Sequence, residues 1–159
     1  MASEPNLYIE PTVGVRSWRW DSASARLVSL ISNEVWEPNE PLTARCSKSH
    51  VAPPRPGTVA AALHDAPMKG CSCGIYAVKT LSHLRLQDYH NDGVLGLVQL
   101  WGRMLVGQKG YRAANAYPLK LYVPHLLWEI ADAGLREYGV PIVLINPWKA
   151  ELNPEEGIT

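Results

Sequence analysis

The first regular pattern in the chain is an alternation of residue character over residues 13–20, VGVRSWRW. Successive side chains of a strand point to opposite faces. Arg16, Trp18 and Trp20 therefore share one face, and positions 13, 15 and 17 share the other. A polar break at residues 21–24 ends the pattern. The sequence predicts a strand with one face rich in tryptophan and arginine.

Shorter apolar runs follow at residues 26–31, 35–36 and 42–46, and the turn-forming sequences SNE and EPNEP separate them. Short strands joined by such turns predict an antiparallel meander. Residues 47–70 are different, because they contain APPRPG, which fits neither a helix nor a central strand. A loop of this length inside a compact domain is usually functional or held by a bound group.

The segment after this loop, residues 74–84, predicts a short helix with an apolar stripe at Ala77, Val78, Leu81 and Leu84. Residues 94–106 are apolar on both faces and predict a central strand, which returns through the turn GQKG into residues 111–123.

Within the first of these two long strands, Gly96 and Gly102 predict bulges or close backbone approaches. Arg103 and Arg112 flank the turn. We interpret them as surface charges, with an anion site as the alternative.

A second helix is predicted over PHLLWEIADAGLREYGVP. Pro124 marks its entry, and Gly139 with Pro141 mark its exit. Its apolar stripe is formed by Leu127, Ile130, Ala131, Leu135 and Tyr138. The sequence VPIVLI then predicts a last short strand.

These elements together predict an α+β fold with a mainly antiparallel sheet, one or two packed helices and a long proline-rich loop. We divide the 159 residues into an N-terminal arm (1–12), one α+β domain (13–145) and a C-terminal tail (146–159).

Composition and charge exclude some classes of function. The chain has 15 basic and 15 acidic residues, and this balance argues against a dedicated nucleic-acid binder. The first residues, MASEPNLYIEP, have neither the cationic start nor the apolar core of a signal peptide, and we find no apolar run of membrane-spanning length. We therefore expect a cytoplasmic protein that does not bind a membrane and keeps its three cysteines reduced.

The cysteines lie at the two ends of the long loop, and two histidines lie inside it. Zinc takes four thiolate or imidazole ligands near a tetrahedron, and a metal at the ends of a loop offsets the entropy cost of ordering it. The first interpretation is one zinc ion that pins the loop, with His50 as the substitute for the histidine ligand. The expected ligands are Cys46, His64, Cys71 and Cys73.

Two other interpretations of the cysteines remain open. Buried free cysteines commonly act as small hydrophobic residues, so all three could be core residues. Alternatively, Cys73 lies at the start of the predicted helix, where the helix dipole would lower the pKa of a thiol and favour a nucleophile.

The sequence CSCGIYAVKTL resembles the catalytic cysteine segment of ubiquitin-like-protein proteases over four or five residues. The resemblance implies a cysteine-dependent hydrolase with Cys73 as the nucleophile and His64 as its partner. The sequence departs from the layout of that family, because His64 lies only nine positions before Cys73 and every glutamine follows Cys73.

A wider set of landmarks runs in a fixed order from Val13 to Val123: GVRSWRW, VWEPNEPLTARC, HDAP, CSCGIYA and LWGRMLVGQKGYRAANAYPLKLYV. In these landmarks the chain resembles a group of small uncharacterised proteins of actinobacteria and their phages. The resemblance implies the three cysteines and the histidine of HDAP as parts of one pattern, which supports zinc, and it implies no activity.

The leading hypothesis is a small protein-interaction module. It would be supported by zinc and, if the phage resemblance holds, would act on a protein of the bacterial host. The motivation is that the sequence has no phosphate loop, no GxSxG and no HExxH motif, while tryptophan and tyrosine, which suit interfaces, are abundant. The expected partner surface is the face with Arg16, Trp18 and Trp20. The alternatives are that this face packs under the second helix, or that it stacks single-stranded nucleic acid.

Overall fold

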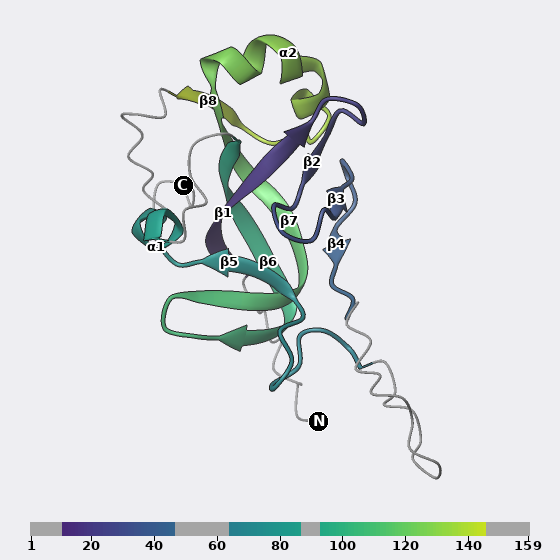
Figure 1. The fold of residues 1–159 in the computed structure, drawn as a ribbon, viewed down its shortest axis with the longest axis vertical. Coiled ribbons are helices and arrows are strands. Elements are labelled where there is room, and N and C mark those ends of the chain that lie inside the picture. The colour runs from purple at the N-terminus through teal and green to yellow at the C-terminus, as the bar shows by residue number, and fades with distance from the viewer. Residues whose placement is uncertain (1–10, 47–63, 87–92, 146–159) are drawn as a thin grey trace, which may run out of the picture.

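The computed structural model describes residues 11–46, 64–86 and 93–145, and this part of the chain forms an α+β fold (Figure 1). Nearly all of the predicted arm and the whole predicted tail lie outside these ranges, as do residues 47–63 of the long loop. In chain order, the elements are β1 (Thr12–Asp21), β2 (Arg26–Val28), β3 (Val35–Trp36), β4 (Leu42–Thr43), β5 (Ile75–Val78), α1 (Leu81–Leu86), β6 (Val94–Val106), β7 (Gly110–Pro124), α2 (His125–Arg136) and β8 (Ile142–Ile145).

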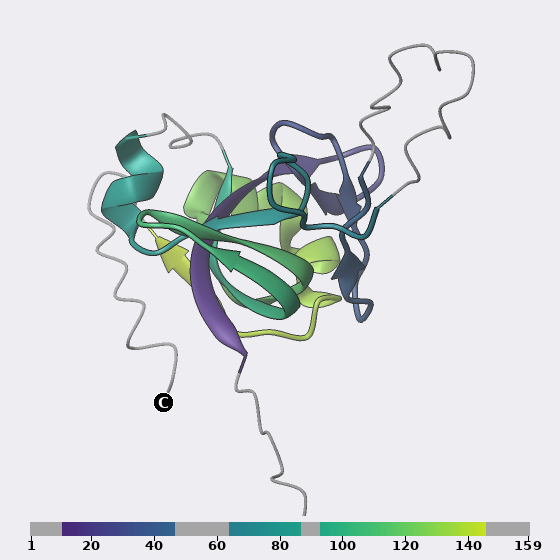
Figure 2. The ribbon, with the colours of Figure 1, turned by 90° about the horizontal axis from the view of Figure 1, so that it is seen from below.

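The strands form one mainly antiparallel sheet, as predicted, and among the strands of the described residues only β8 runs parallel to its neighbour, β7. Of the predicted meander, β1, β2 and β3 pair in sequence order, whereas the run at residues 42–46 forms β4, which pairs with β7 and not with β3. Strands β5 and β6 each pair with both β1 and β7, so these four strands form a closed ring. The contact between β1 and β5 that closes the ring consists of one residue pair, Val15 with Val78. The view from below shows these strands wrapping around one another (Figure 2).

The predicted pair of long strands is confirmed as β6 and β7. Its register shifts twice, between Leu97 and Val98 and between Trp101 and Met104. Gly102 lies inside the second shift with a φ of +80°, which a residue with a side chain rarely adopts. Gly96 marks a close approach, because a Cβ atom there would lie 2.5 Å from the carbonyl oxygen of Lys120. Both glycine predictions are therefore confirmed.

The prediction of a helix over residues 74–84 is wrong in its first half. Ile75 to Val78 form β5 and pair with residues 110–113 of β7. The helix begins only at Leu81, after Thr80, whose hydroxyl accepts a hydrogen bond from the backbone N–H of His83 at 3.3 Å. This hydrogen bond is a helix N-cap and marks the start of the helix. The four residues of the predicted apolar stripe are therefore divided between β5 and α1.

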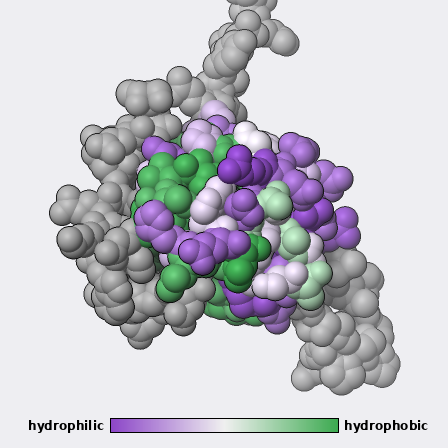
Figure 3. All heavy atoms as spheres, turned by 90° about the horizontal axis from the view of Figure 1, so that it is seen from above, coloured by the Kyte–Doolittle hydropathy of each residue, from purple (hydrophilic) through white to green (hydrophobic). Residues whose placement is uncertain are grey.

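The second helix is confirmed as α2, but its apolar stripe is narrower than predicted. Ala131 and Leu135 are buried against the sheet, whereas Ile130 is 71% exposed. A step of one residue turns the side chain about 100° around a helix, which carries Ile130 away from the sheet. Leu126 is exposed as well, and the view onto this end of the molecule shows hydrophobic and hydrophilic surface side by side (Figure 3).

The main core lies between the sheet and α2, and it is built around two indoles. Trp18 and Trp36 meet edge to face with their ring centroids 5.4 Å apart, and both are buried. Tyr138 closes the same core beyond the end of α2. Neither helix of the described residues is long and apolar enough to cross a membrane.

Candidate metal centre

The first two residues of the centre come together through backbone pairing beyond β4. The N–H of Ala44 donates to the carbonyl of Ala114 at 2.7 Å, which extends the contact of β4 with β7. The next residue, Arg45, then forms an antiparallel bridge with Asp65. In an antiparallel pair the following residue of one segment faces the preceding residue of the other, so Cys46 lies opposite His64.

The other two residues lie in the tight turn before β5. The N–H of Cys71 donates to the carbonyl of Met68 at 3.1 Å, and Gly70 and Gly74 have positive φ angles of 86° and 116°. The chain between the glycines alternates, because Cys71 and Cys73 are buried and Ser72 is exposed. Both thiols therefore point inward from the same side of this segment.

Arg112 on β7 holds this turn in place. Its guanidinium donates to the carbonyl of Cys71 and, at 3.2 Å, to the carbonyl of Cys73. The hydroxyl of Tyr76 donates to the remaining carbonyl, that of Ser72, at 2.6 Å. The Arg112 guanidinium also lies over the ring of Tyr76, at 5.8 Å from its centroid. Two neighbouring strands thus fix all three carbonyls of the segment that carries the two thiols.

The four predicted ligand residues converge on one point. The donor atoms of Cys46, His64, Cys71 and Cys73 all lie within 4.8 Å of one another. The Sγ atoms of Cys46 and Cys71 are 3.7 Å apart, and Nε2 of His64 is 3.3 Å from Sγ of Cys73. Zinc bond lengths place tetrahedral ligand atoms roughly 3.5–3.8 Å apart, so the cluster has the size of a metal site.

The surroundings of the cluster suit a soft metal ion. Cys71 and Cys73 are each 8% exposed and pack with Ala66, Ala44 and Cys46 in a small core of their own. Three thiols and an imidazole prefer zinc over magnesium or calcium, which select oxygen ligands. The cluster Cys46, His64, Cys71 and Cys73 could thus bind a metal ion such as zinc. The substitute ligand, His50, lies outside the described residues.

The structure changes the basis of the catalytic interpretation of Cys73. His64 lies within hydrogen-bond distance of its sulfur, at 3.3 Å. However, Cys73 precedes the strand β5 and not a helix, so the expected helix dipole does not act on its thiol. Two further thiols share the site, whereas a nucleophile with its base needs only two residues.

The predicted partner surface on β1 is largely internal. Trp18 is fully buried, so its indole cannot contact a partner. Trp20 is partly buried, and its ring leaves no room for a Cβ atom at Gly134 of α2. Arg16 donates to the carbonyl of Tyr76 at 2.5 Å and to the hydroxyl of Ser29 at 2.8 Å. The alternative, that the tryptophans pack under α2, is the one that the structure supports.

The sequence did not reveal the roles of Arg112 and Tyr76. The sequence favours a surface charge at Arg112, but its guanidinium donates to the carbonyls of Cys71 and Cys73, which are 41 and 39 positions away in the chain. Only the register of β5 against β7, in which Tyr76 pairs with Arg112, brings the two side chains to the turn. No local sequence pattern marks Arg112 or Tyr76 for this role, because the role of both side chains depends on that register.

Comparisons of this chain with protein-family models, with curated proteins and with solved structures found no match.

Proposed function

We propose that the protein is a zinc-stabilised protein-interaction module, in which Cys46, His64, Cys71 and Cys73 hold one zinc ion. The observation that carries this proposal is the convergence of four soft donor atoms within 4.8 Å. Four protein ligands fill a tetrahedron and leave no position for a reacting water, which is typical of structural and not of catalytic zinc. The metal would join the end of β4, the His64 segment and the turn before β5.

The experiment that tests the metal is the zinc content of the purified chain. We expect about one equivalent of zinc per chain, measured by elemental analysis after dialysis against metal-free buffer. A chain that stays below about 0.1 equivalent, even after reconstitution with zinc under reducing conditions, would refute the site, since structural zinc sites bind far more tightly than dialysis can reverse.

The nature of the partner also belongs to the proposal. The wider resemblance to small proteins of actinobacteria and their phages supports a protein of a bacterial host as that partner, and a place in the host cytoplasm. Single-stranded nucleic acid is the less favoured partner, because the neutral chain lacks a basic excess and Trp18 is buried.

Replacing Arg112 tests whether the turn is organised for the metal. Arg112→Met removes the donor to the carbonyls of Cys71 and Cys73 and leaves all four ligands in place. We expect zinc affinity to fall roughly 10- to 100-fold, as when other groups that orient metal ligands are removed, while the stoichiometry stays at one. Competition with a chromophoric chelator measures the affinity. Arg103→Met, an exposed arginine on β6, is the matched control, and an equal loss in both variants would contradict a specific role.

A cysteine-dependent hydrolase is the second candidate, because His64 lies 3.3 Å from the sulfur of Cys73. The two candidates differ in thiol reactivity. With zinc bound, we expect iodoacetamide at mildly acidic pH to modify none of the three cysteines selectively, because metal-bound and buried thiols are protected. Mass spectrometry of tryptic peptides measures the rates. Selective alkylation of Cys73, about tenfold faster than that of Cys46 and Cys71, would favour the hydrolase.

A further inference from the structure

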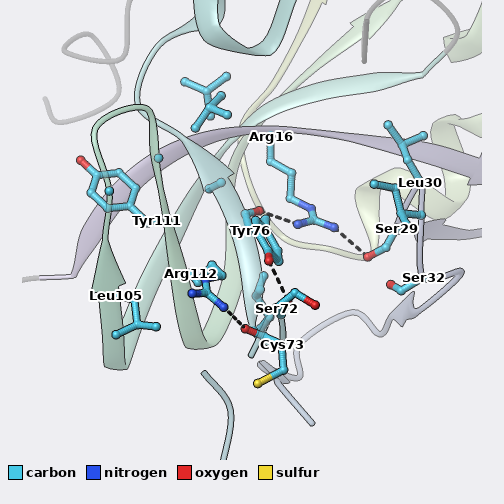
Figure 4. A pocket seen from close by; sticks show the side chains of 18 of the residues that line it. Arg16, Ser29, Leu30, Ser32, Ser72, Cys73, Tyr76, Leu105, Tyr111 and Arg112 are labelled. Atoms are coloured by element: carbon cyan, nitrogen blue, oxygen red, sulfur yellow. Dashed lines mark hydrogen bonds between the residues drawn. The ribbon is translucent and has the colours of Figure 1, made fainter. Parts of the chain in front are cut away.

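A wide groove runs across β5, next to the metal centre (Figure 4). Its floor is formed by β1 and β5, and its two walls are the turn after β2 (residues 29–34) and the β6–β7 hairpin (residues 105–112). Ser72 and Cys73 close one end. The volume, about 1370 Å3, exceeds the ~300–1,000 Å3 that is usual for small-molecule pockets. The groove is large enough for a segment of another chain.

The charges that line the groove are mostly of one sign. Arg16, Arg45, Lys109 and Arg112 line it, and Glu34 is the acidic residue among the lining residues. The whole chain, by contrast, has equal numbers of basic and acidic residues. The groove is therefore a local concentration of positive charge on a neutral protein, which attracts an anionic partner.

Two of these cations are fixed, and two are available. Arg16 bridges the Tyr76 carbonyl and the Ser29 hydroxyl and lies over the ring of Trp36, and Arg112 holds the cysteine turn. Arg45 and Lys109 are exposed and, within the described part of the chain, form no ion pair with a carboxylate within 4 Å. The groove thus combines two fixed cations, Arg16 on its floor and Arg112 on one wall, with two side chains that can turn to a partner.

The walls also expose apolar side chains. Ile31 and Val106 are 76% and 67% exposed on opposite walls, and the ring of Tyr76, between them, is 50% exposed. Burial raises the pKa of Glu34, and the charges of Arg16 and Arg45 oppose this shift, so both arginines act on a carboxylate inside the groove. A carboxylate of a partner would enter the same field beside exposed apolar side chains.

We propose that this groove binds an extended segment of a partner protein that carries acidic and apolar side chains. This inference rests on the proposed function as an interaction module and names the chemistry of its partner. Side chains of an extended segment alternate between two directions, which suits a cationic floor with apolar rims. A nucleic acid fits less well, because the most exposed side chains of the two walls, Ile31 and Val106, are aliphatic and do not stack bases.

The test selects ten-residue peptides from a random display library against the zinc-loaded, full-length protein. We expect the selected peptides to be enriched in Asp and Glu together with apolar residues, and depleted in Lys and Arg. A selected peptide, followed by fluorescence anisotropy, should lose about tenfold or more in affinity for the double variant Arg45→Glu and Lys109→Glu, because attraction becomes repulsion at two positions. Arg103→Glu with Lys120→Glu is the matched control, outside the lining of the groove, and should change affinity less than about twofold.

Three results would overturn the inference: no enrichment of acidic peptides, equal losses in both double variants, or a 20-nucleotide oligo-dT that binds more tightly than every peptide with a steep salt dependence. The last result would assign the groove to nucleic acid. Zinc content is measured on every variant. A chain that takes up no zinc but selects acidic peptides would refute the metal site and support the groove. A zinc-loaded chain that selects no acidic peptide would refute the groove and support the metal site.

Discussion

Cys71→Ser should reduce the zinc content from about one equivalent to near zero and lower the free energy of unfolding. Serine cannot replace a thiolate, and Cys71 is one of the four converging residues, with its sulfur 3.7 Å from that of Cys46. A metal that binds only the folded state stabilises it by about 2.7 kcal/mol when free zinc is 100 times Kd, and by about 4.1 kcal/mol at 1,000 times. We expect a loss in this range, measured by urea unfolding with and without zinc.

Removal of zinc should loosen the segments around the cysteine cluster before it affects the rest of the fold. Cys71, Cys73 and Ala66 form a small core that is separate from the main core around Trp18 and Trp36. Chelation of zinc should therefore speed amide hydrogen exchange in residues 64–74 and leave the amides of β6 and β7 protected. Uniform acceleration across the sheet would show instead that the metal supports the whole fold.

Two histidine variants, one at the cluster and one away from it, test the role of His64. His64→Asn removes the nitrogen ligand, and His125→Asn changes an exposed histidine at the start of α2. The first variant should weaken zinc binding strongly, and the second should leave it unchanged. If both variants bind zinc like the natural chain, His64 is not a ligand.

The long strands were predictable because a single property defines each of them. Val94–Val106 is apolar on both faces, and its bounds in the structure are those that the sequence predicted. The turn GQKG and the glycines at 96 and 102 are local signals that depend only on backbone sterics. Such elements can be derived without knowing their neighbours.

The strand β5 was missed for the opposite reason. Ile75 to Val78 is too short to show a period, and a short apolar run is compatible with either a helix or a strand. The pairing with residues 110–113 of β7, which are distant in sequence, decides its conformation. The same error placed Cys73 before a helix and led to the expectation that a helix dipole lowers the pKa of its thiol.

The members of the cluster were predictable from residue types, but its geometry was not. Few residues other than cysteine and histidine bind zinc, so the three cysteines and the loop histidines were the natural candidates. The means of bringing them together could not be derived. The Arg45–Asp65 bridge and the Arg112 contacts join segments that no sequence spacing connects.

The error at Trp18 has a related cause. An alternating pattern shows which residues share a face but not which face is covered. The closure of β1 against β5 and β6 places Trp18 inside, against Trp36. Arg16 remains at the border, where its charge lines the groove and its hydrogen bonds go to Tyr76 and Ser29.

Tyr138 connects α2 to the meander through one buried hydroxyl. The side chain is only 1% exposed. Its hydroxyl donates to the carbonyl of Trp36 at 2.5 Å and accepts from the N–H of Leu27 at 2.8 Å. Leu27 and Trp36 are themselves buried, so water cannot replace a lost partner.

Tyr138→Phe should therefore lower the free energy of unfolding by roughly 1–3 kcal/mol, because it removes two buried hydrogen bonds, at about 0.5–1.5 kcal/mol each. Tyr111→Phe is the matched control. Its ring is only partly buried, so we expect a change within about 0.5 kcal/mol. Urea unfolding at pH 7 measures both variants, and equal effects would show that the hydroxyl of Tyr138 contributes nothing specific.

The ionisation of the same hydroxyl predicts how the difference in stability between the natural chain and Tyr138→Phe depends on pH. Burial raises the pKa of Tyr138 to about 12, from the value of 10.0 that an exposed tyrosine has. The folded protein therefore keeps the phenol protonated where the unfolded chain has begun to ionise. A raised pKa stabilises the fold fully below pH 10, and this contribution is lost as the pH rises from about 10 to about 12. The stability advantage of the natural chain over Tyr138→Phe should thus shrink across that interval. An advantage that is constant from pH 8 to pH 12, measured by urea unfolding at each pH, would mean that the hydroxyl ionises equally in the folded and unfolded chains and is not held in the buried hydrogen bonds described above.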